Sequence, residues 1–234
     1  LSEAQKRAFE AEGRKPHWRL LLEHKEIAWT DVIRGPVTFD GAKLSDPVLL
    51  RADTTPTYTL ATVVDDIELG VSHIIRAEDH VANTAVQLQL FDALGRDTSG
   101  LTFAHFTLLT DAGGHNLSKR LGSLSVAGLR DQGIEAMAID SLLARLGTSL
   151  PVEPVRTLAE LVATSDLANF SRAAPKLDLD ELKRINSRLI HDLPFAVVSE
   201  RLRALELADV DERLWNAARP NLATVAEVAM WRDI

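Results

Sequence analysis

The order of hydrophobic and polar residues divides the chain into two parts. Up to about residue 110, short apolar or alternating runs take turns with stretches in which apolar residues recur every three or four positions. The first pattern is typical of strands and the second of helices. Beyond Leu124 only the helical spacing remains. The pattern therefore predicts an α/β part followed by an all-helical part.

The first part is expected to hold parallel strands joined by helical crossovers. The run at 72–76 is short, β-branched and apolar, which is the profile of a buried parallel strand. An apolar stripe on the helix behind it comprises Val81, Ala85, Leu88, Phe91 and Leu94. The expected elements are a polar helix at 2–12, two or three short antiparallel strands at 18–39, a strand at 47–51, a helix at 56–69, a strand at 72–76, a helix at 81–94 and a strand at 103–109.

The second part shows three helical stripes, near residues 160, 185 and 200. Pro151 and Pro154, with polar neighbours, predict a joint near residue 150. We expect three segments, with boundaries near 50 and 150. Residues 1–50 hold short antiparallel strands, 51–150 form the α/β segment, and 151–234 are helical.

Composition narrows the class of protein. The 234 residues are 46% hydrophobic and 26% charged, which is typical of a folded domain. A net charge of −8 excludes a general attraction to phosphate backbones or anionic lipid. No cysteine is present and no apolar run reaches about 18 residues, so we expect a cytoplasmic protein without disulfides or membrane contact. Because the sequence begins with Leu1 and not with an initiating Met, we also expect a fragment of a longer protein.

A glycine-flanked loop after the last expected strand carries adjacent cations. It reads Asn116, Leu117, Ser118, Lys119, Arg120. Lys and Arg on such a loop suit a polyphosphate, because they stabilise charge that develops on phosphate oxygens, but a solvated basic turn has the same composition. The patterns G-x-x-x-x-G-K-[ST] and G-x-G-x-x-G are both absent, which argues against P-loop and dinucleotide enzymes.

A second candidate lies where the 72–76 strand ends. Ligands of open α/β sheets bind beyond the carboxyl ends of strands, so Arg76 is placed to bind a carboxylate. The alternatives are an ion pair of Arg76 with Glu78 or Asp79, and a helix N-cap role for Asp79. No histidine spacing predicts a metal site.

Two hydroxyl-bearing residues form the third candidate. Tyr58 and Thr62 are four residues apart and share one helix face, where they are able to contact a polar ligand. A tyrosine packed in the core with its hydroxyl satisfied is the alternative.

In this order and spacing, the motifs closely resemble those of bacterial glutamyl-tRNA synthetases, which are class I aminoacyl-tRNA synthetases. The resemblance rests on the runs at 51–58, 63–67, 70–80, 83–84, 117–120, 125–147, 171–176 and 182–190.

The resemblance implies a fold and a set of roles. The fold is α/β, namely the C-terminal half of a Rossmann-like catalytic domain with a small antiparallel insertion, followed by an all-α region for the tRNA stem and anticodon. Arg76, Tyr58 and Thr62 match the glutamate pocket. The ATP-binding positions implied are Asn116, Leu117, Ser118, Lys119, Asp79 and His80. Lys119 and Arg120 match the catalytic KMSKS loop.

The implied reaction activates L-glutamate with ATP and Mg²⁺, without zinc, and transfers it to tRNA-Glu. The family's His-Ile-Gly-His signature is absent, so the chain is expected to be a central fragment that is inactive alone. Asn116 replaces the usual first lysine of the loop, and Thr62 stands where relatives often have Asn. The alternatives are a non-catalytic tRNA-binding module and a glutamyl-queuosine tRNA synthetase-like enzyme, and the helical extension at 151–234 argues against the latter.

Overall fold

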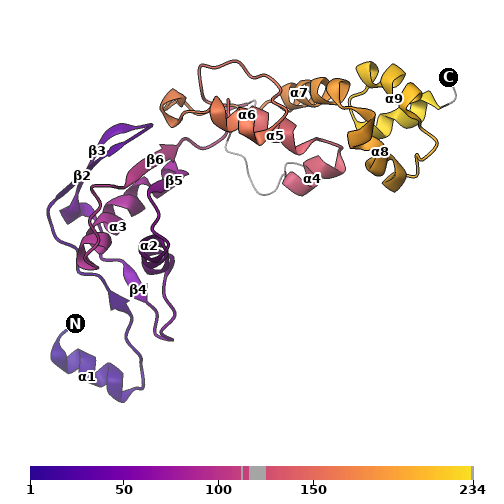
Figure 1. Cartoon of the computed structure of the whole chain (residues 1–234). Helices are drawn as coiled ribbons and strands as arrows, with labels where there is room; N and C mark the ends of the chain where they lie inside the picture. Colours follow the sequence, from indigo (N-terminus) through magenta and orange to yellow (C-terminus); the bar gives the residue numbers. More distant parts are fainter. Residues whose placement is uncertain (112, 116–124, 233–234) are drawn as a thin grey trace. The chain divides into compact units, whose positions relative to one another are not determined.

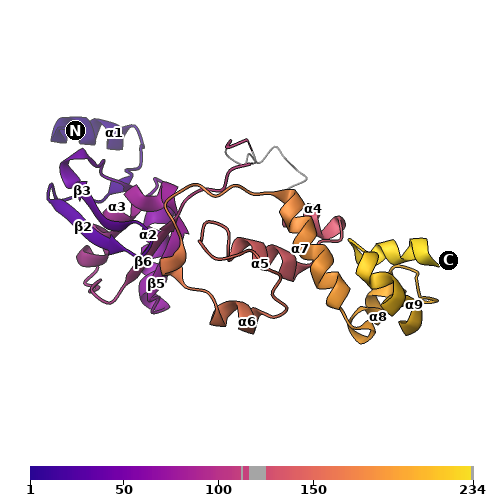
Figure 2. The same cartoon turned by 90° about the horizontal axis from the view of Figure 1, so that it is seen from above.

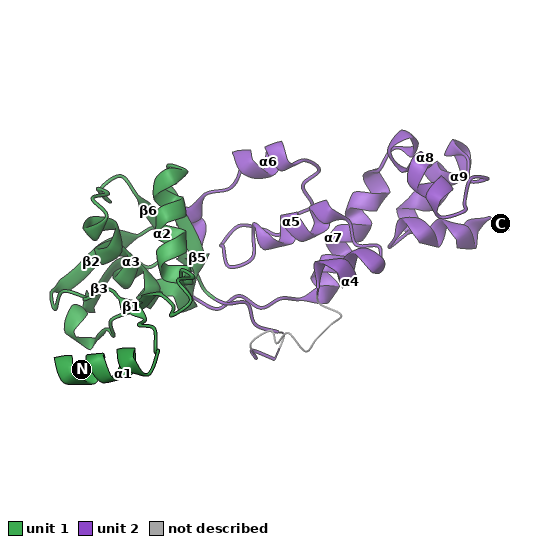
Figure 3. Ribbon diagram, turned by 90° about the horizontal axis from the view of Figure 1, so that it is seen from below, with its two compact units in different colours: residues 1–107 green, residues 108–234 purple. Residues whose placement is uncertain are grey.

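The structure is a computed structural model that describes residues 1–111, 113–115 and 125–232. Its chain divides into two units, Leu1–Thr107 and Leu108–Ile234 (Figure 3). Each unit has a core of its own. The three segments expected from the sequence, with boundaries near 50 and 150, stay a prediction.

A four-stranded sheet organises the first unit, with strand order β3-β2-β6-β5. Its members are β2 (Glu26–Asp31), β3 (Gly35–Asp40), β5 (His73–Ala77) and β6 (Thr102–Phe106). The β2–β3 hairpin is antiparallel, whereas β6 is parallel to β5 and also to β2, through Asp31 opposite Phe103. The antiparallel strands expected from the sequence therefore join the parallel sheet, a pairing that the sequence pattern did not predict.

Helices pack beside this sheet and complete the core (Figure 1). They are α2 (Tyr58–Glu68) and α3 (Val81–Ala93), and α3 with the short η2 (Glu78–His80) forms the crossover from β5 to β6. The core consists of Val63, Ile74, Leu90, Phe91 and Phe103. Outside the main sheet lie α1 (Glu3–Ala11), η1 (Gly41–Lys43) and the antiparallel pair β1 (Trp18–Arg19) and β4 (Val48–Leu50). The predicted strand–helix–strand unit is thus confirmed.

Two details of the predicted burial are wrong. Strand β5 is buried on one face only: Ile74 packs into the core, but Ile75 is 46% exposed. The reason is that β5 is the edge strand of the sheet and its side chains alternate between a covered and an open face. Leu94 is likewise exposed, because α3 ends at Ala93. Polar Thr84 and Gln87 are buried on α3 instead.

The second unit is helical, as the spacing of its apolar residues predicts. Its elements are α4 (Val126–Asp131), α5 (Ala136–Leu143), α6 (Leu158–Ala163), η4 (Leu167–Asn169), α7 (Leu179–Asp192), α8 (Phe195–Ala204), α9 (Glu212–Ala218), η5 (Arg219–Asn221) and η6 (Val225–Trp231). Within the described part of this unit, the only β pairing consists of isolated bridges, Thr110 with Lys176 and Thr148 with Phe170.

Helix α7 takes part in both cores of this unit. Helix α5 packs along α7 (Figure 2), where Ala138 and Leu142 meet Leu182 and Ile185. The end of α7 contributes Ile190 to a second cluster built around the fully buried Trp215. Across the described residues of the chain, no helix combines the length and apolarity needed to span a membrane.

Candidate functional site

Arg76 lies near the carboxyl end of β5, and two neutral side chains of α3 hold its guanidinium. Nη1 donates a 2.5 Å hydrogen bond to Oε1 of Gln87, and Nη2 donates to Oγ1 of Thr84. Within the described part of the chain, the buried Nε–H has no acceptor. An arginine has five N–H donors in a planar fork, so Arg76 is fixed in orientation while donors remain for a ligand.

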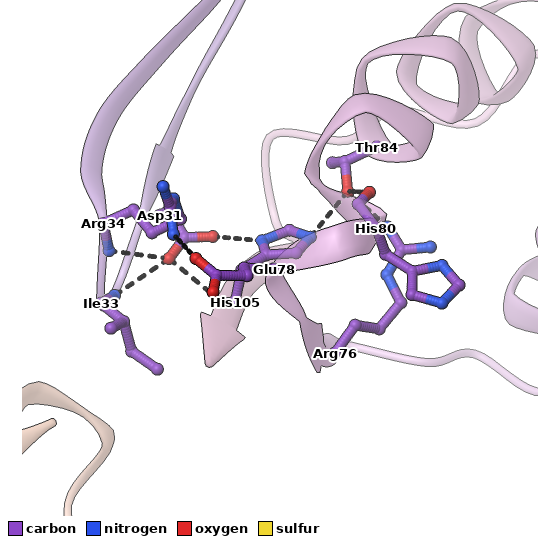
Figure 4. A network of polar contacts seen from close by, with 8 residues as sticks. All are labelled: Asp31, Ile33, Arg34, Arg76, Glu78, His80, Thr84 and His105. Atoms are coloured by element: carbon purple, nitrogen blue, oxygen red, sulfur yellow. Dashed lines mark hydrogen bonds and ion pairs between the residues drawn. The ribbon is translucent and has the colours of Figure 1, made fainter. Parts of the chain in front are cut away.

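A buried series of hydrogen bonds extends from Thr84 on α3 to Asp31 on β2. Figure 4 shows the His105 ring between Thr84 and Asp31. The His105 Nε2 lies 2.9 Å from the Thr84 hydroxyl, and its Nδ1 lies 2.5 Å from the Asp31 carboxylate. Asp31 also accepts the backbone N–H groups of Ile33, Arg34 and His105. These hydrogen bonds thus connect β2, β6 and α3, and through Arg76 they reach β5.

Burial and hydrogen bonding fix the charges in this network. Burial lowers the pKa of His105, and the positive charges of Arg76 and Arg34 lower it further, although Asp31 opposes them. Burial alone raises the pKa of Asp31, but the hydrogen bonds from His105 and from three backbone N–H groups outweigh it, so the pKa is lowered. The pair therefore consists of an ionised Asp31 and a neutral His105 at neutral pH.

A second series of hydrogen bonds connects Arg76 with α2 by way of Gln87. The Gln87 Nε2 donates to the Thr62 hydroxyl at 2.8 Å, and Thr62 in turn donates to the carbonyl oxygen of Tyr58. The Tyr58 side chain is 47% exposed, and its hydroxyl lies 3.4 Å from Nδ1 of His80. The interpretation of Tyr58 as a core residue with a satisfied hydroxyl is therefore wrong. The structure brings Arg76, Thr62 and Tyr58 into one connected cluster.

Neither structural alternative for the residues after β5 is found. Among the described residues, Glu78 forms its ion pair with Arg34, at 2.9 Å, and not with Arg76. The residue before α3 is His80, and the Asp79 side chain makes no capping hydrogen bond, so the N-cap interpretation of Asp79 is wrong. His80 contacts Tyr58 and Asn83, whereas Asp79 is exposed and stays outside this network.

This arrangement suits a carboxylate ligand. The two hydrogen-bond acceptors that hold Arg76 are uncharged, so they leave its positive charge available to an anion. Burial raises the pKa of the nearby Asp66, and the positive charge of Arg76 opposes this shift. A planar fork with free donors binds a carboxylate in preference to a point-like anion.

The loop of the predicted ATP contacts falls outside the described residues. Asn116, Leu117, Ser118, Lys119 and Arg120 all belong to it, so their position relative to Arg76 stays a prediction. In the part of the chain that is described, no three His, Cys, Asp or Glu side chains form a group that could hold a metal ion.

Sequence reasoning missed the residues that hold Arg76 in place. Thr84 and Gln87 are polar residues directly beside the apolar stripe of the 81–94 helix, and His105 interrupts the apolar 103–109 strand. Such polar residues at buried positions are the available signal. Asp31 had no comparable signal, because its role depends on the pairing of β2 with β6.

The fold and the site define an α/β domain with a fixed arginine side chain at the carboxyl edge of its sheet. Residues 1–184 match the family described as "tRNA synthetases class I (E and Q), catalytic domain", and the chain belongs to this family. The family-level resemblance expected from the motifs is thereby confirmed.

Individual relatives agree with this assignment. The chain is 55% identical to a glutamate–tRNA ligase of Azospirillum brasilense and 54% identical to glutamate–tRNA ligase 1 of Rhizorhabdus wittichii, in each case over 99% of the chain and 51% of the relative. The chain therefore spans about half the length of these curated relatives. The interpretation of the chain as a central fragment stays a prediction.

Among solved structures, the fold is similar to that of a glutamate tRNA ligase from Elizabethkingia meningosepticum in complex with its amino acid. The TM-score is 0.82 at 22% identity, over 98% of this chain and 51% of the other. At this identity the comparison supports the fold alone, which is an α/β part followed by a helical part.

Proposed function

We propose that this chain is part of a glutamate–tRNA ligase and binds L-glutamate through Arg76. The observation that carries the proposal is the fixed Arg76 fork, whose two acceptors are neutral and whose buried Nε–H has no partner among the described residues. A carboxylate supplies acceptors for such donors, and a charge-assisted pair is stronger than a neutral hydrogen bond. The similarity to ligases for glutamate supports this choice of carboxylate.

Tyr58 and Thr62 complete the glutamate site in this proposal. The Thr62 hydroxyl is already bonded to Gln87 and to the Tyr58 carbonyl, so its main effect is to hold Gln87, and through it Arg76, in place. The exposed Tyr58 hydroxyl is free to turn from His80 towards a ligand, since that contact is long at 3.4 Å.

ATP is the second substrate, together with Mg²⁺ and without zinc. In this proposal Asp79 and His80 lie near the adenosine, and Asn116, Leu117, Ser118 and Lys119 contact the phosphates. A glutamate carboxylate oxygen attacks the α-phosphate, which gives glutamyl-adenylate and pyrophosphate. Lys119 and Arg120 stabilise the negative charge that develops on the departing pyrophosphate oxygens. The glutamyl group then passes to the terminal ribose of tRNA-Glu, and the cytoplasm is the expected location.

The test is ATP–pyrophosphate exchange with glutamate, measured with tRNA present. We expect no exchange from the chain alone and exchange once the preceding half of a class I nucleotide fold is supplied. Exchange by the chain alone contradicts its predicted inactivity. An absence of exchange in both forms, together with tRNA binding, favours the non-catalytic module. Residues 172–203 contain 7 basic and 5 acidic residues, a local charge that both candidates predict, so the exchange assay and not the charge separates them.

A further inference from the structure

Thr84 occupies a central position in the buried network of the first unit. Its side chain is fully buried, yet its single hydroxyl meets three groups: Nη2 of Arg76, Nε2 of His105 and the carbonyl oxygen of His80. A hydroxyl has one proton to donate and two lone pairs to accept. Because the Arg76 group donates only, Thr84 must accept from it, and its own proton goes elsewhere.

The Asp31–His105 pair determines where that proton goes. The Asp31 carboxylate only accepts, so Nδ1 of His105 carries a hydrogen at the 2.5 Å contact. In the neutral ring Nε2 is then an acceptor, and at 2.9 Å it is a closer partner for the Thr84 proton than the His80 carbonyl oxygen at 3.3 Å. The hydrogen bonds therefore all run in one direction, from Arg76 through Thr84 and His105 to Asp31.

We propose that Thr84 and His105 are positioning residues for Arg76: their oriented hydrogen bonds hold the guanidinium in the orientation that binds the substrate carboxylate. This inference rests on the proposed function, in which that carboxylate belongs to glutamate. Neither residue contacts the ligand in this account. Their effect is to present a lone pair of the Thr84 hydroxyl to Nη2.

The physical argument is one of preorganisation. A free arginine side chain has many rotamers, and fixing it on ligand binding costs affinity. Thr84 and Gln87 remove that cost by holding one Nη group each. Asp31 is itself fixed, because three backbone N–H groups donate to its carboxylate. The orientation of Arg76 thus depends on the pairing of β2 with β6.

The first test compares Thr84→Val with Thr84→Ser. Valine has the shape of threonine without the hydroxyl, and serine keeps the hydroxyl. We expect Thr84→Val to weaken glutamate binding by about 10- to 100-fold, as for a lost hydrogen bond to a charged group, and Thr84→Ser to stay within about threefold of the wild type. Calorimetric titration of glutamate into the chain measures this. Equal loss in both variants, or no loss in Thr84→Val, overturns the proposal.

The second test uses His105. A glutamine amide reaches towards the former Nε2 position and serves Thr84, whereas an asparagine amide reaches towards the former Nδ1 position and serves Asp31. We expect His105→Asn to weaken glutamate binding by about tenfold and His105→Gln by less. In a form with exchange activity, the KM for glutamate rises and the KM for ATP does not. The reverse order of the two variants, or an equal rise of both KM values, contradicts a positioning role.

A ligand-free measurement separates this inference from the proposed function. In ¹⁵N NMR spectra of the chain, we expect His105 to be the Nδ1–H tautomer. We also expect the Nη protons of Arg76 to exchange slowly with water in the wild type and in Thr84→Ser, and to exchange fast in Thr84→Val. If these results hold and the wild type binds no glutamate, the positioning role stands and glutamate as the ligand is wrong. If His105 carries its proton on Nε2, or Thr84→Val leaves Arg76 unchanged, the inference is wrong whatever the chain binds.

Discussion

Each unit of the chain contains a fully buried polar side chain, and the two are used differently. In the second unit Asn186 accepts from the backbone N–H of Glu135 at 2.7 Å and donates to the carbonyl oxygens of Gly133 and Ala223. In the first unit Thr84 connects Arg76 with His105 and, through it, with Asp31. Both side chains are 0% exposed.

The difference lies in where the hydrogen bonds end. All three bonds of Asn186 end on backbone groups, both of its donors are used, and no charge is involved. The network of Thr84 has an ionised carboxylate at one end and, at the other, an arginine with an unpartnered Nε–H among the described residues. A closed network fixes the fold, whereas a network that ends on unused charged donors indicates a ligand.

The largest effect is expected for Asn186→Leu. It leaves two carbonyl oxygens and one N–H without their partner inside the second unit, at about 1–3 kcal/mol for each unsatisfied group. We expect unfolding of this unit to become easier by about 3 kcal/mol or more, in urea unfolding followed by the amide signals of α7. Glutamate affinity measured below the unfolding transition should not change. A matching loss of affinity contradicts the division into a closed and an open network.

Arg76→Lys should show the opposite behaviour. Lysine keeps a positive charge but loses the planar fork, so glutamate binding should weaken about 100-fold or more. The unfolding free energy of the first unit should fall by less than that of the second unit falls in Asn186→Leu. The reason is that the substitution also removes the buried Nε–H, which has no acceptor among the described residues. Calorimetry and urea unfolding of the same sample measure both effects. Equal weakening of glutamate and ATP binding assigns Arg76 to the structure instead.

The open network also predicts a pH dependence that Asn186 does not. Because the folded pKa of His105 is lowered, its contribution to stability is complete above the ordinary histidine value of 6.5 and is lost as pH falls through the folded pKa. Arg76, Arg34 and Asp31 are the charges that act on the ring. The pKa of Asp31 is also lowered, so a second loss follows below 3.8.

The measurement is urea unfolding of the first unit between pH 7 and 5, followed by the Phe103 and Ala104 amide signals. The His105→Gln variant is the control, since it lacks the titrating ring. We expect the wild type to lose more unfolding free energy than the variant over this range, because burial lowers the pKa of His105 and protonation of the ring therefore opposes folding. Parallel pH curves contradict a neutral His105.

The smallest effect is expected beside Asn186 at the surface. Arg201 forms a bidentate ion pair with Glu135, at 2.9 and 2.6 Å, but its side chain is 43% exposed. Arg201→Met should therefore change the unfolding free energy by less than about 1 kcal/mol, and added salt should reduce the difference. If Arg201→Met lowers the unfolding free energy as much as Asn186→Leu does, the ion pair, and not the Asn186 amide, provides most of the stability in this region.

The sequence predicts the elements better than it predicts their contacts. Apolar periodicity gives both the 81–94 helix and the 182–190 stripe because repeats of that kind are local. It misses the burial of Thr84 and Gln87, since a polar residue is assigned to the surface unless its partners are known. Arg76 is predicted as a site residue because ligands of open α/β sheets bind where a strand ends beside the start of a helix. Asp31 is missed because only the long-range pairing of β2 with β6 brings it to His105.

The central claim is that the fork of Arg76 binds the amino acid while its partners hold it still. The most direct measurement follows the Arg76 Nε–H resonance in a ¹H–¹⁵N spectrum during titration with L-glutamate. The account predicts a saturable downfield shift with slowed exchange of that proton, as expected when a buried donor gains a carboxylate acceptor. Saturable shifts elsewhere in the chain while the Arg76 signal stays unchanged contradict it.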